Sequence, residues 1–221
     1  MTIHAVLFDL DGTLLDTLAD IAQAANEALA VEGLPAHPDA DYRDFIGDGV
    51  AMLFRRALPP GSADEARVAR CVEAFQVTYS RHWDRRTRPY PGIPELLDAL
   101  TARGMALAVL SNKPDDFTRM YGDRYLAPWP FRIVVGHREG VPRKPDPAGA
   151  LEIAGRLGLE PAAIAYVGDS GVDMKTARGA GMYAVGVNWG FRPEEELWAN
   201  GADAIIGHPF ELLGVLDGFG R

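Results

Sequence analysis

The sequence predicts an α/β fold in which a doubly wound parallel sheet forms the core and a group of helices is inserted as a second domain. Three observations predict it. Short apolar runs without alternation recur along the chain, as expected for strands that are covered on both faces. Helical patterns lie between several of these runs, which indicates alternating strands and helices. One stretch, residues 16–88, reads as helical and contains no convincing strand.

Six short apolar runs are the expected strands, and most of them are rich in Val, Ile and Ala. Each ends in a polar or turn-forming residue, which is typical of strand ends. In chain order they are residues 5–8 (AVLF), 106–110 (ALAVL), 131–136 (FRIVVG), 163–168 (AIAYVG), 183–188 (YAVGVN) and 202–207 (ADAIIG).

Three helices are expected in the part of the chain that carries the later strands. They are residues 93–104, 147–159 and 170–181. In the first of them, Leu and Ala recur at helical spacing and Gly104 provides a stop. Strand, helix, strand and helix in this order predict the doubly wound core.

Residues 16–88 contain three more expected helices, at 17–34, 49–58 and 63–84. The first is amphipathic, and Thr17 is a suitable N-cap. Roughly 70 residues is the size of a small domain. We therefore expect residues 1–15 and 89–221 to form the α/β core and residues 16–88 to form a helical cap over its mouth. The alternative is that these helices pack on one face of the sheet.

Composition excludes several classes of partner. The formal net charge is −9, with 31 acidic against 22 basic residues, whereas proteins that bind nucleic acid usually carry a basic excess. No apolar run approaches the roughly 18 residues of a membrane span. The N-terminus lacks the basic region of a signal peptide, and Cys71 is the only cysteine. We expect a cytoplasmic protein without an internal disulfide.

Polar side chains follow four of the expected strands. They are Asp9, Asp11, Ser111, Lys144, Asp169 and Asp173. In an open α/β sheet, ligands bind beyond the carboxyl ends of the strands, so these side chains are expected to converge. Carboxylates brought together repel one another unless a cation lies among them. Mg²⁺ suits oxygen ligands of this kind and commonly binds a substrate phosphate as well, and Lys144 with the Ser111 hydroxyl suits phosphate oxygens. The pattern predicts a site for a phosphoryl group.

The first pair of carboxylates, Asp9 and Asp11, allows two different roles in one reaction. One carboxylate, ionised, can attack phosphorus. The other can give a proton to the leaving oxygen and later take one from water. An unperturbed Asp has a pKa of about 3.9, so the second carboxyl has to be raised by its neighbours to carry a proton near neutral pH.

Four segments resemble the four motifs of the haloacid dehalogenase superfamily, in the same order. They are DLDGTLLDT, LSNKP, RKPDP and VGDSGVDMKTARGAGM, which begin at residues 9, 110, 143 and 167. The resemblance spans the whole Rossmann-like core, and the helical insert lies where that family's first type of cap lies. Within the superfamily, the chain is most similar to the phosphoglycolate phosphatases.

The resemblance implies which residues do the chemistry. Asp9 corresponds to the nucleophile that forms an aspartyl-phosphate. Asp11 corresponds to the general acid and base, and its backbone carbonyl is implied as a ligand of Mg²⁺ together with Asp9 and Asp169. Asp173 is implied to hold a metal-bound water or to orient Lys144.

The same resemblance implies four residues that hold the phosphoryl group. Ser111 and Lys144 contact it, with Asn112 beside them, and Thr13 supports the turn that carries Asp9. The implied function is a Mg²⁺-dependent phosphatase of small phosphorylated metabolites, with 2-phosphoglycolate as the best single substrate. A sugar phosphomutase or a pyrophosphatase on the same scaffold is the alternative. A non-enzymatic phospho-aspartate receiver is a more distant one, because receivers lack a helical insert.

The insert offers one further signal, the loop Gly47-Asp48-Gly49 before the expected helix at 49–58. In the resembling phosphatases such a loop faces the active site. Arg55 or Arg56 could then reach a substrate carboxylate, or both could be surface residues. The partner expected from these observations is a small phosphate ester, with the protein acting as a monomer or a homodimer.

Overall fold

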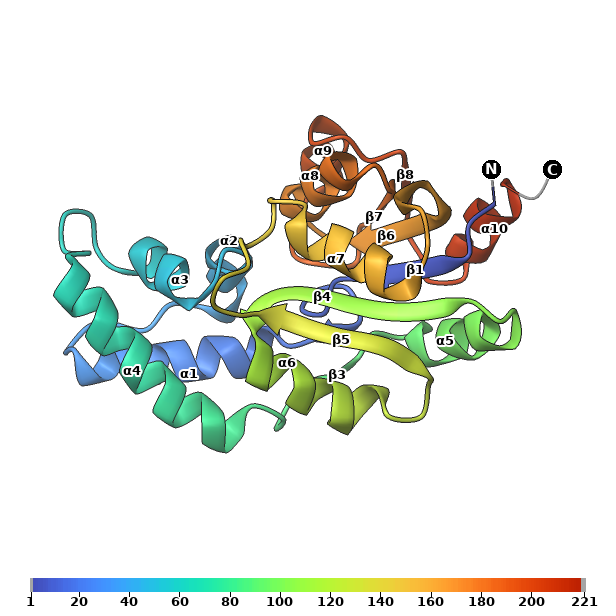
Figure 1. Cartoon of the computed structure of the whole chain (residues 1–221). Coiled ribbons are helices and arrows are strands. Elements are labelled where there is room, and N and C mark those ends of the chain that lie inside the picture. Colours follow the sequence, from blue (N-terminus) through green and yellow to red (C-terminus); the bar gives the residue numbers. More distant parts are fainter. Residues whose placement is uncertain (1, 220–221) are drawn as a thin grey trace. The chain divides into compact units, whose positions relative to one another are not determined.

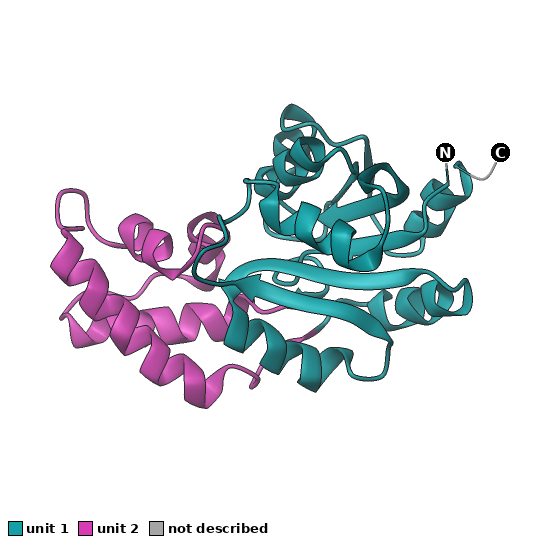
Figure 2. Cartoon of the chain, in the orientation of Figure 1, with its two compact units in different colours: residues 1–15, 89–221 teal, residues 16–88 magenta. Residues whose placement is uncertain are grey.

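The computed structural model describes residues 2–219 and shows two compact units. One unit contains Met1–Leu15 and Pro89–Arg221, and the other contains Asp16–Arg88 (Figure 2). The two segments that connect them, β2 (Leu15–Asp16) and β3 (Arg88–Pro89), pair as a two-stranded sheet. No helix among the described residues has the length and apolar character needed to cross a bilayer.

The larger unit is built on a six-stranded sheet with the order β5-β4-β1-β6-β7-β8 (Figure 1). All of its neighbouring strands pair in parallel, which confirms the predicted sheet. The strands are β1 (Ala5–Phe8), β4 (Ala106–Pro114), β5 (Phe131–His137), β6 (Ile164–Gly168), β7 (Tyr183–Val187) and β8 (Ala204–Ile206).

Helices cover both faces of this sheet, as the uninterrupted apolar strands require. On one face, α7 (Ala148–Leu157), α8 (Gly171–Ala180) and α9 (Glu194–Ala199) contribute side chains to a buried apolar cluster with the strands. On the opposite side of the sheet lie α5 (Ile93–Ala102) and α6 (Asp115–Tyr121) (Figure 1). The remaining elements of this unit are η2 (Gly122–Leu126), η3 (Pro161–Ala163) and α10 (Glu211–Asp217).

The register of the three central strands brings their carboxyl ends to one place. Phe8 of β1 pairs with Val109 of β4 and with Val167 of β6. Asp9 is the next residue along β1, and Asp169 follows Val167 by two positions. Because parallel strands end at the same edge of a sheet, side chains from three distant parts of the sequence meet there.

One strand is longer than expected. Ser111 was expected to follow the strand that ends at Leu110, but β4 continues to Pro114. The register with β5 shifts between Leu110 and Pro114, and Pro114 then pairs with His137. The polar residues Ser111, Asn112 and Lys113 therefore lie within an irregular strand end and not in a loop. An irregularity of this kind re-aims the side chains next to it.

The smaller unit is helical. Its main helices are α1 (Leu18–Val31), α3 (Val50–Ala57) and α4 (Glu65–His82), which correspond to the three expected helices, with the short η1 (Asp39–Asp41) and α2 (Tyr42–Phe45) between α1 and α3. The helix α4 packs against both α1 and α3.

The prediction that Thr17 is the N-cap residue of α1 is wrong in one respect. Thr17 precedes α1, but its hydroxyl makes no capping hydrogen bond. The backbone of Thr17 has φ −105° and ψ −3°, whereas the side chain of a capping residue reaches the first turn from an extended backbone.

Candidate active site

Asp9 lies in a tight turn at the end of β1. Its carboxylate accepts a hydrogen bond from the backbone N–H of Leu10 at 2.7 Å. The carbonyl of Leu10 in turn accepts from the N–H groups of Leu14 and Leu15, at 3.1 and 3.0 Å. Gly12 has a φ of 84°, a backbone conformation that glycine adopts without steric cost. These bonds fold the chain back directly after Asp9 and hold its carboxylate at the edge of the sheet.

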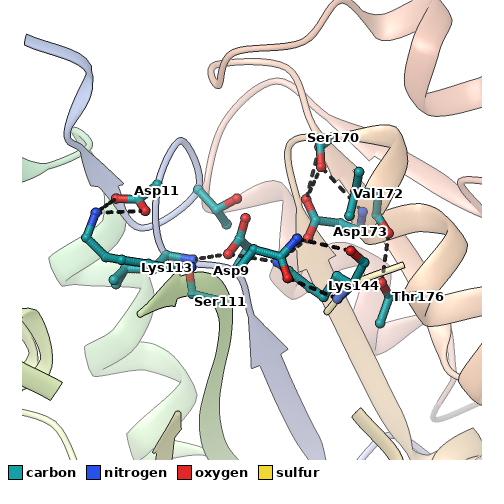
Figure 3. A network of polar contacts seen from close by, with 12 residues as sticks. Asp9, Asp11, Ser111, Lys113, Lys144, Ser170, Val172, Asp173 and Thr176 are labelled. Atoms are coloured by element: carbon teal, nitrogen blue, oxygen red, sulfur yellow. Dashed lines mark hydrogen bonds and ion pairs between the residues drawn. The ribbon is translucent and has the colours of Figure 1, made fainter. Parts of the chain in front are cut away.

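Lys144 reaches two carboxylates at once. Its Nζ lies 2.9 Å from Oδ1 of Asp9 and 2.7 Å from Oδ1 of Asp173, and Figure 3 shows the three side chains pointing toward one another. Although burial lowers the pKa of Lys144, the carboxylates of Asp173 and Asp9 raise it well above its usual value. The ammonium is therefore charged at neutral pH.

Asn112 holds the backbone that carries Lys144. The N–H of Lys144 donates to Oδ1 of Asn112 at 2.9 Å, and Nδ2 of Asn112 donates to the carbonyl of Lys144 at 3.1 Å. Ser111, Asn112 and Lys144 also line one pocket, which extends to Arg138 and Arg143. The structure thus brings together three of the four residues predicted to hold a phosphoryl group.

Asp173 is fully buried and is bonded through both of its oxygens. Besides Lys144, the hydroxyl of Tyr166 lies 3.3 Å from Oδ1. The N–H and the hydroxyl of Ser170 donate to Oδ2, at 3.1 and 2.6 Å. The N–H of Asp173 lies 3.3 Å from the Ser170 hydroxyl oxygen, and together with the Ser170 N–H it forms a capping box at the start of α8. The helix start therefore fixes Asp173, and Asp173 fixes Lys144.

Asp169 lies between the turn after β1 and the segment after β7. Its Oδ1 accepts from the hydroxyl of Thr13 at 3.2 Å, and its Oδ2 accepts from the N–H of Phe191 at 2.8 Å. Two glycines leave room for it, because a Cβ on Gly12 would lie 2.4 Å from Oδ2 of Asp169 and one on Gly190 would lie 2.2 Å from its Cβ. Thr13, predicted to contact the phosphoryl group, donates here to a carboxylate.

The carboxylates of the site oppose one another electrostatically. Burial, followed by the charge of Asp173, raises the pKa of Asp169 to about 7, although the N–H of Phe191 and the charge of Lys144 lower it. Burial, followed by the charge of Asp173, likewise raises the pKa of Asp9 well above its usual value, although Lys144 lowers it.

These residues fit a divalent cation. Asp9, Asp169 and Asp173 each offer one oxygen, and the three oxygens lie within 4.8 Å of one another. Carboxylate oxygens are the ligands that Mg²⁺ and similar hard ions prefer. A cation among them would favour the ionised forms that burial disfavours. Asp173 accepts four hydrogen bonds, from Lys144, Tyr166 and Ser170. Asp169 accepts two, and the contacts of Asp9 with Leu10 and Lys144 both fall on Oδ1, so Asp9 and Asp169 keep more oxygen lone pairs for a cation and are the better direct ligands.

Asp11 lies apart from this group. Its side chain is directed toward Lys113 and away from Asp9 and Lys144 (Figure 3), and Nζ of Lys113 lies 3.1 and 3.0 Å from its two oxygens. Sequence reasoning missed Lys113. The sequence offered one signal, the rarity of lysine, because only three of the 22 basic residues are lysines. In the structure two of the three, Lys113 and Lys144, have buried ammonium groups at this site.

Arg55 and Arg56, the two arginines considered as ligands of a substrate carboxylate, are engaged within the helical unit. Arg55 forms an ion pair with Glu65 at 2.5 Å. Arg56 pairs with Asp48 and donates to the carbonyl of Phe45 at 3.1 Å. Arg56 therefore braces the loop Gly47-Asp48-Gly49 from one side.

The comparisons with known proteins agree with this geometry. The model of the family described as haloacid dehalogenase-like hydrolase matches residues 6–187. An N-acetylmuramic acid 6-phosphate phosphatase from Pseudomonas aeruginosa is 35% identical over 98% of this chain and 96% of its own. A phosphoglycolate phosphatase from Yersinia pseudotuberculosis is 33% identical over 96% and 92% of the two chains.

Solved structures show the same similarity. A protein from Lactobacillus delbrueckii subsp. bulgaricus, assigned as a phosphoglycolate phosphatase, superimposes with a TM-score of 0.92 at 32% identity. The match covers 98% of this chain and 99% of that one. The chain therefore belongs to the haloacid dehalogenase-like hydrolases, and it is an enzyme similar to the phosphoglycolate phosphatases of that family.

Proposed function

We propose that this enzyme is a Mg²⁺-dependent phosphomonoesterase of small phosphorylated metabolites and that it works through an aspartyl-phosphate on Asp9. The contact of Lys144 with Asp9, 2.9 Å from Nζ to Oδ1, carries the proposal. It places a buried ammonium beside the carboxylate that is to attack phosphorus, where the ammonium can stabilise the charge that develops on the phosphoryl oxygens. Ser111 and Thr13 complete the proposed phosphoryl-binding group.

The reaction requires two proton transfers. As Oδ of Asp9 bonds to phosphorus and the ester P–O bond breaks, Asp11 gives its proton to the leaving oxygen. Asp11 then takes a proton from water while that water attacks phosphorus and the bond to Asp9 breaks. Overall, a phosphate ester and water give an alcohol and inorganic phosphate. General acid–base steps of this kind each accelerate a reaction by about 10²–10⁴-fold.

A bound Mg²⁺ would supply positive charge that stabilises the transferring phosphoryl group. Asp9 and Asp169 would hold it, with the backbone carbonyl of Asp11. This assignment is supported by the carboxylate oxygens that lie within 4.8 Å of one another and by the raised pKa values of Asp9 and Asp169, since each carboxyl gains from a cation.

We further propose that Asp16–Arg88 acts as a cap that closes on bound substrate and excludes water, as lids do in many enzymes. Two observations support this proposal: the unit is compact, and it is inserted in the chain directly after the turn that carries Asp9. A cytoplasmic location is part of the proposal, because Cys71 is the single cysteine.

Two compounds are the leading candidates for the substrate. Phosphoglycolate phosphatases are similar to this chain at 31–34% identity, which favours 2-phosphoglycolate. The relative from Pseudomonas aeruginosa is 35% identical, which makes N-acetylmuramic acid 6-phosphate the second candidate. The two differ in the alcohol that leaves and not in the reaction at phosphorus.

The test is release of inorganic phosphate from both candidates, from sugar phosphates and from pyrophosphate, with Mg²⁺ and with a chelator. We expect Mg²⁺-dependent release from one of the two candidates, and loss of that release in Asp9→Asn. Glu139→Gln, which removes an exposed acid, is the matched control. Substrate isomerisation without free phosphate would indicate a mutase, preferred release from pyrophosphate would indicate a pyrophosphatase, and a stable phosphoprotein without turnover would indicate a receiver.

A further inference from the structure

Lys113 is the partner of Asp11 in this structure. Its ammonium lies 3.1 and 3.0 Å from the two carboxylate oxygens, and the two side chains are only 6% and 13% exposed. On another side, the ammonium lies 4.8 Å from the centre of the buried Tyr121 ring, within the range of a cation–π contact. The carboxylate and the aromatic ring therefore hold the ammonium from two sides.

The backbone of Lys113 is held as well. Its N–H lies 3.2 Å from the hydroxyl of Ser111, and its carbonyl accepts from the hydroxyl of Thr118 at 3.3 Å. Gly136 of β5 passes so close that a Cβ there would lie 2.4 Å from the Lys113 carbonyl oxygen. The ammonium thus reaches Asp11 from a fixed point at the irregular end of β4.

The residue type also points to a specific role. The chain has only three lysines among 22 basic residues, so arginine is its usual cation. The third lysine, Lys175, is exposed on α8. A lysine ammonium is a compact point charge, whereas the arginine guanidinium is a wide planar fork. The compact group suits a position 3.0 Å from an Asp11 oxygen and 4.8 Å from the centre of the Tyr121 ring.

We propose that Lys113 is the positioning residue for Asp11, holding the Asp11 carboxyl apart from Asp9 so that a phosphoryl group fits between them. This inference rests on the proposed function. In phosphoryl transfer the attacking and leaving oxygens lie roughly in line. The group that protonates the leaving oxygen therefore stands on the far side of phosphorus from Asp9. Without Lys113, Lys144 and a bound cation would attract the Asp11 carboxylate toward Asp9.

Two substrates with different leaving groups test this role of Lys113. The first-turnover release of alcohol from 2-phosphoglycolate needs a proton from Asp11, whereas nitrophenolate leaves p-nitrophenyl phosphate without one. In Lys113→Met we expect the first-turnover rate with 2-phosphoglycolate to fall by about 10²-fold, the scale of general acid catalysis. The burst of nitrophenolate is expected to stay close to that of the wild type, while the later steady state slows because Asp11 also activates water.

Three further variants sharpen the result. Lys175→Met removes an exposed lysine and is expected to change neither rate. Lys113→Arg keeps the charge, and we expect it to retain more activity with 2-phosphoglycolate than Lys113→Met does. In an Asp11→Asn background, Lys113→Met is expected to cause no further loss, because residues that act through one another are non-additive. This double variant also removes both charges of the buried pair, so that neither partner is left alone.

Two outcomes would overturn the inference. One is an equal loss of first-turnover rate with both esters in Lys113→Met, and the other is a further loss of rate when Lys113→Met is added to Asp11→Asn. A wild type that releases no phosphate from any ester would overturn the proposed function and this inference together. An active wild type with equal losses for the two esters would overturn only the role of Lys113.

Discussion

Nζ of Lys144 lies 2.7 Å from Oδ1 of Asp173, and both side chains are almost completely buried, at 4% and 0% exposure. The pair connects the loop after β5 with the first turn of α8. Charges buried in this way are tolerated when they are paired and fully hydrogen-bonded. This pair and its neighbours are therefore where single substitutions give the largest effects.

Asp173→Asn is expected to lower both stability and activity. Four donors from Lys144, Tyr166 and Ser170 are directed at two carboxylate oxygens, and an amide offers only one oxygen. Donors left without an acceptor cost about 1–3 kcal/mol of unfolding free energy, measured by urea denaturation. The exposed control Glu139→Gln is expected to stay within about 0.5 kcal/mol of the wild type, and an equally stable Asp173→Asn would contradict the prediction.

The stabilising effect of Mg²⁺ is expected to grow with pH. In the metal-free protein the pKa of Asp169 is raised to about 7, above its value in the unfolded chain, so between about pH 4 and 7 the folded state binds more protons. This group therefore makes unfolding easier as the pH rises through that interval. Mg²⁺ binding requires the deprotonated carboxylate.

Thermal unfolding with and without Mg²⁺ checks this pH dependence. We expect a larger rise in Tm on adding Mg²⁺ at about pH 8 than at about pH 5. In Asp169→Asn the rise is expected to disappear at both pH values. Equal rises at the two pH values in the wild type would show that Asp169 does not control the binding of the cation.

Gly190→Ala is expected to weaken Mg²⁺ binding and phosphatase activity. A Cβ at Gly190 would lie 2.2 Å from Cβ of Asp169 and 2.6 Å from the carbonyl oxygen of Gly12, so Asp169 and the turn after β1 have to shift. The matched control is Gly155→Ala in α7, where a Cβ meets nothing within 4 Å.

Titration with Mg²⁺, followed by activity and by unfolding, distinguishes the two glycine variants. Gly155→Ala is expected to raise stability by roughly 0.5–1 kcal/mol, because glycine is unfavourable inside a helix, and to leave the apparent Mg²⁺ affinity unchanged. Wild-type Mg²⁺ affinity in Gly190→Ala would show that the close approach to Asp169 has no functional consequence.

Asp20→Ala is expected to loosen the end of the helical unit. The buried Asp20 of α1 accepts hydrogen bonds from the N–H of Arg86 and from the N–H and hydroxyl of Thr87, each at about 2.9 Å. Loss of this acceptor costs about 1–3 kcal/mol and frees the segment before β3. Limited trypsin digestion is expected to cut faster after Arg85 and Arg86.

Asp39→Ala is the control for Asp20→Ala. Asp39 also lies near Arg86, at 3.6 Å, but its side chain is 52% exposed, and exposed ion pairs contribute little to stability. Asp39→Ala is expected to digest like the wild type. Equal digestion of Asp20→Ala and Asp39→Ala would show that Asp20 does not hold this segment.

Much of the fold was predictable because it depends on local patterns. The apolar runs that end at Phe8 and Gly168 form buried strands, the run that ends at Gly136 forms a partly buried one, and the parallel sheet was correctly expected from them. Strand ends were less predictable, as Ser111 shows, because whether β4 continues depends on its register with β5. The capping of α1 by Thr17 failed for a similar reason, since the backbone conformation that a cap needs is set by the preceding turn.

The candidate site was also predictable only in part. That Asp9, Lys144, Asp169 and Asp173 are close neighbours follows from parallel strands whose carboxyl ends share one edge. Their partners did not follow. Phe191 contacts Asp169 from 22 residues away, and Lys113 contacts the neighbouring acid Asp11 from 102 residues away, and no spacing in the chain indicates such contacts.

The sequence by itself determined the order of strands and helices, the apolar runs that make the sheet, and the chemical groups that stand at the strand ends. Only the tertiary structure decided which ammonium meets which carboxylate: Lys144 with Asp9 and Asp173, and Lys113 with Asp11. The physical reason is that hydrophobic patterning acts along the chain, whereas an ion pair depends on distances of a few ångström that the packing of remote segments sets.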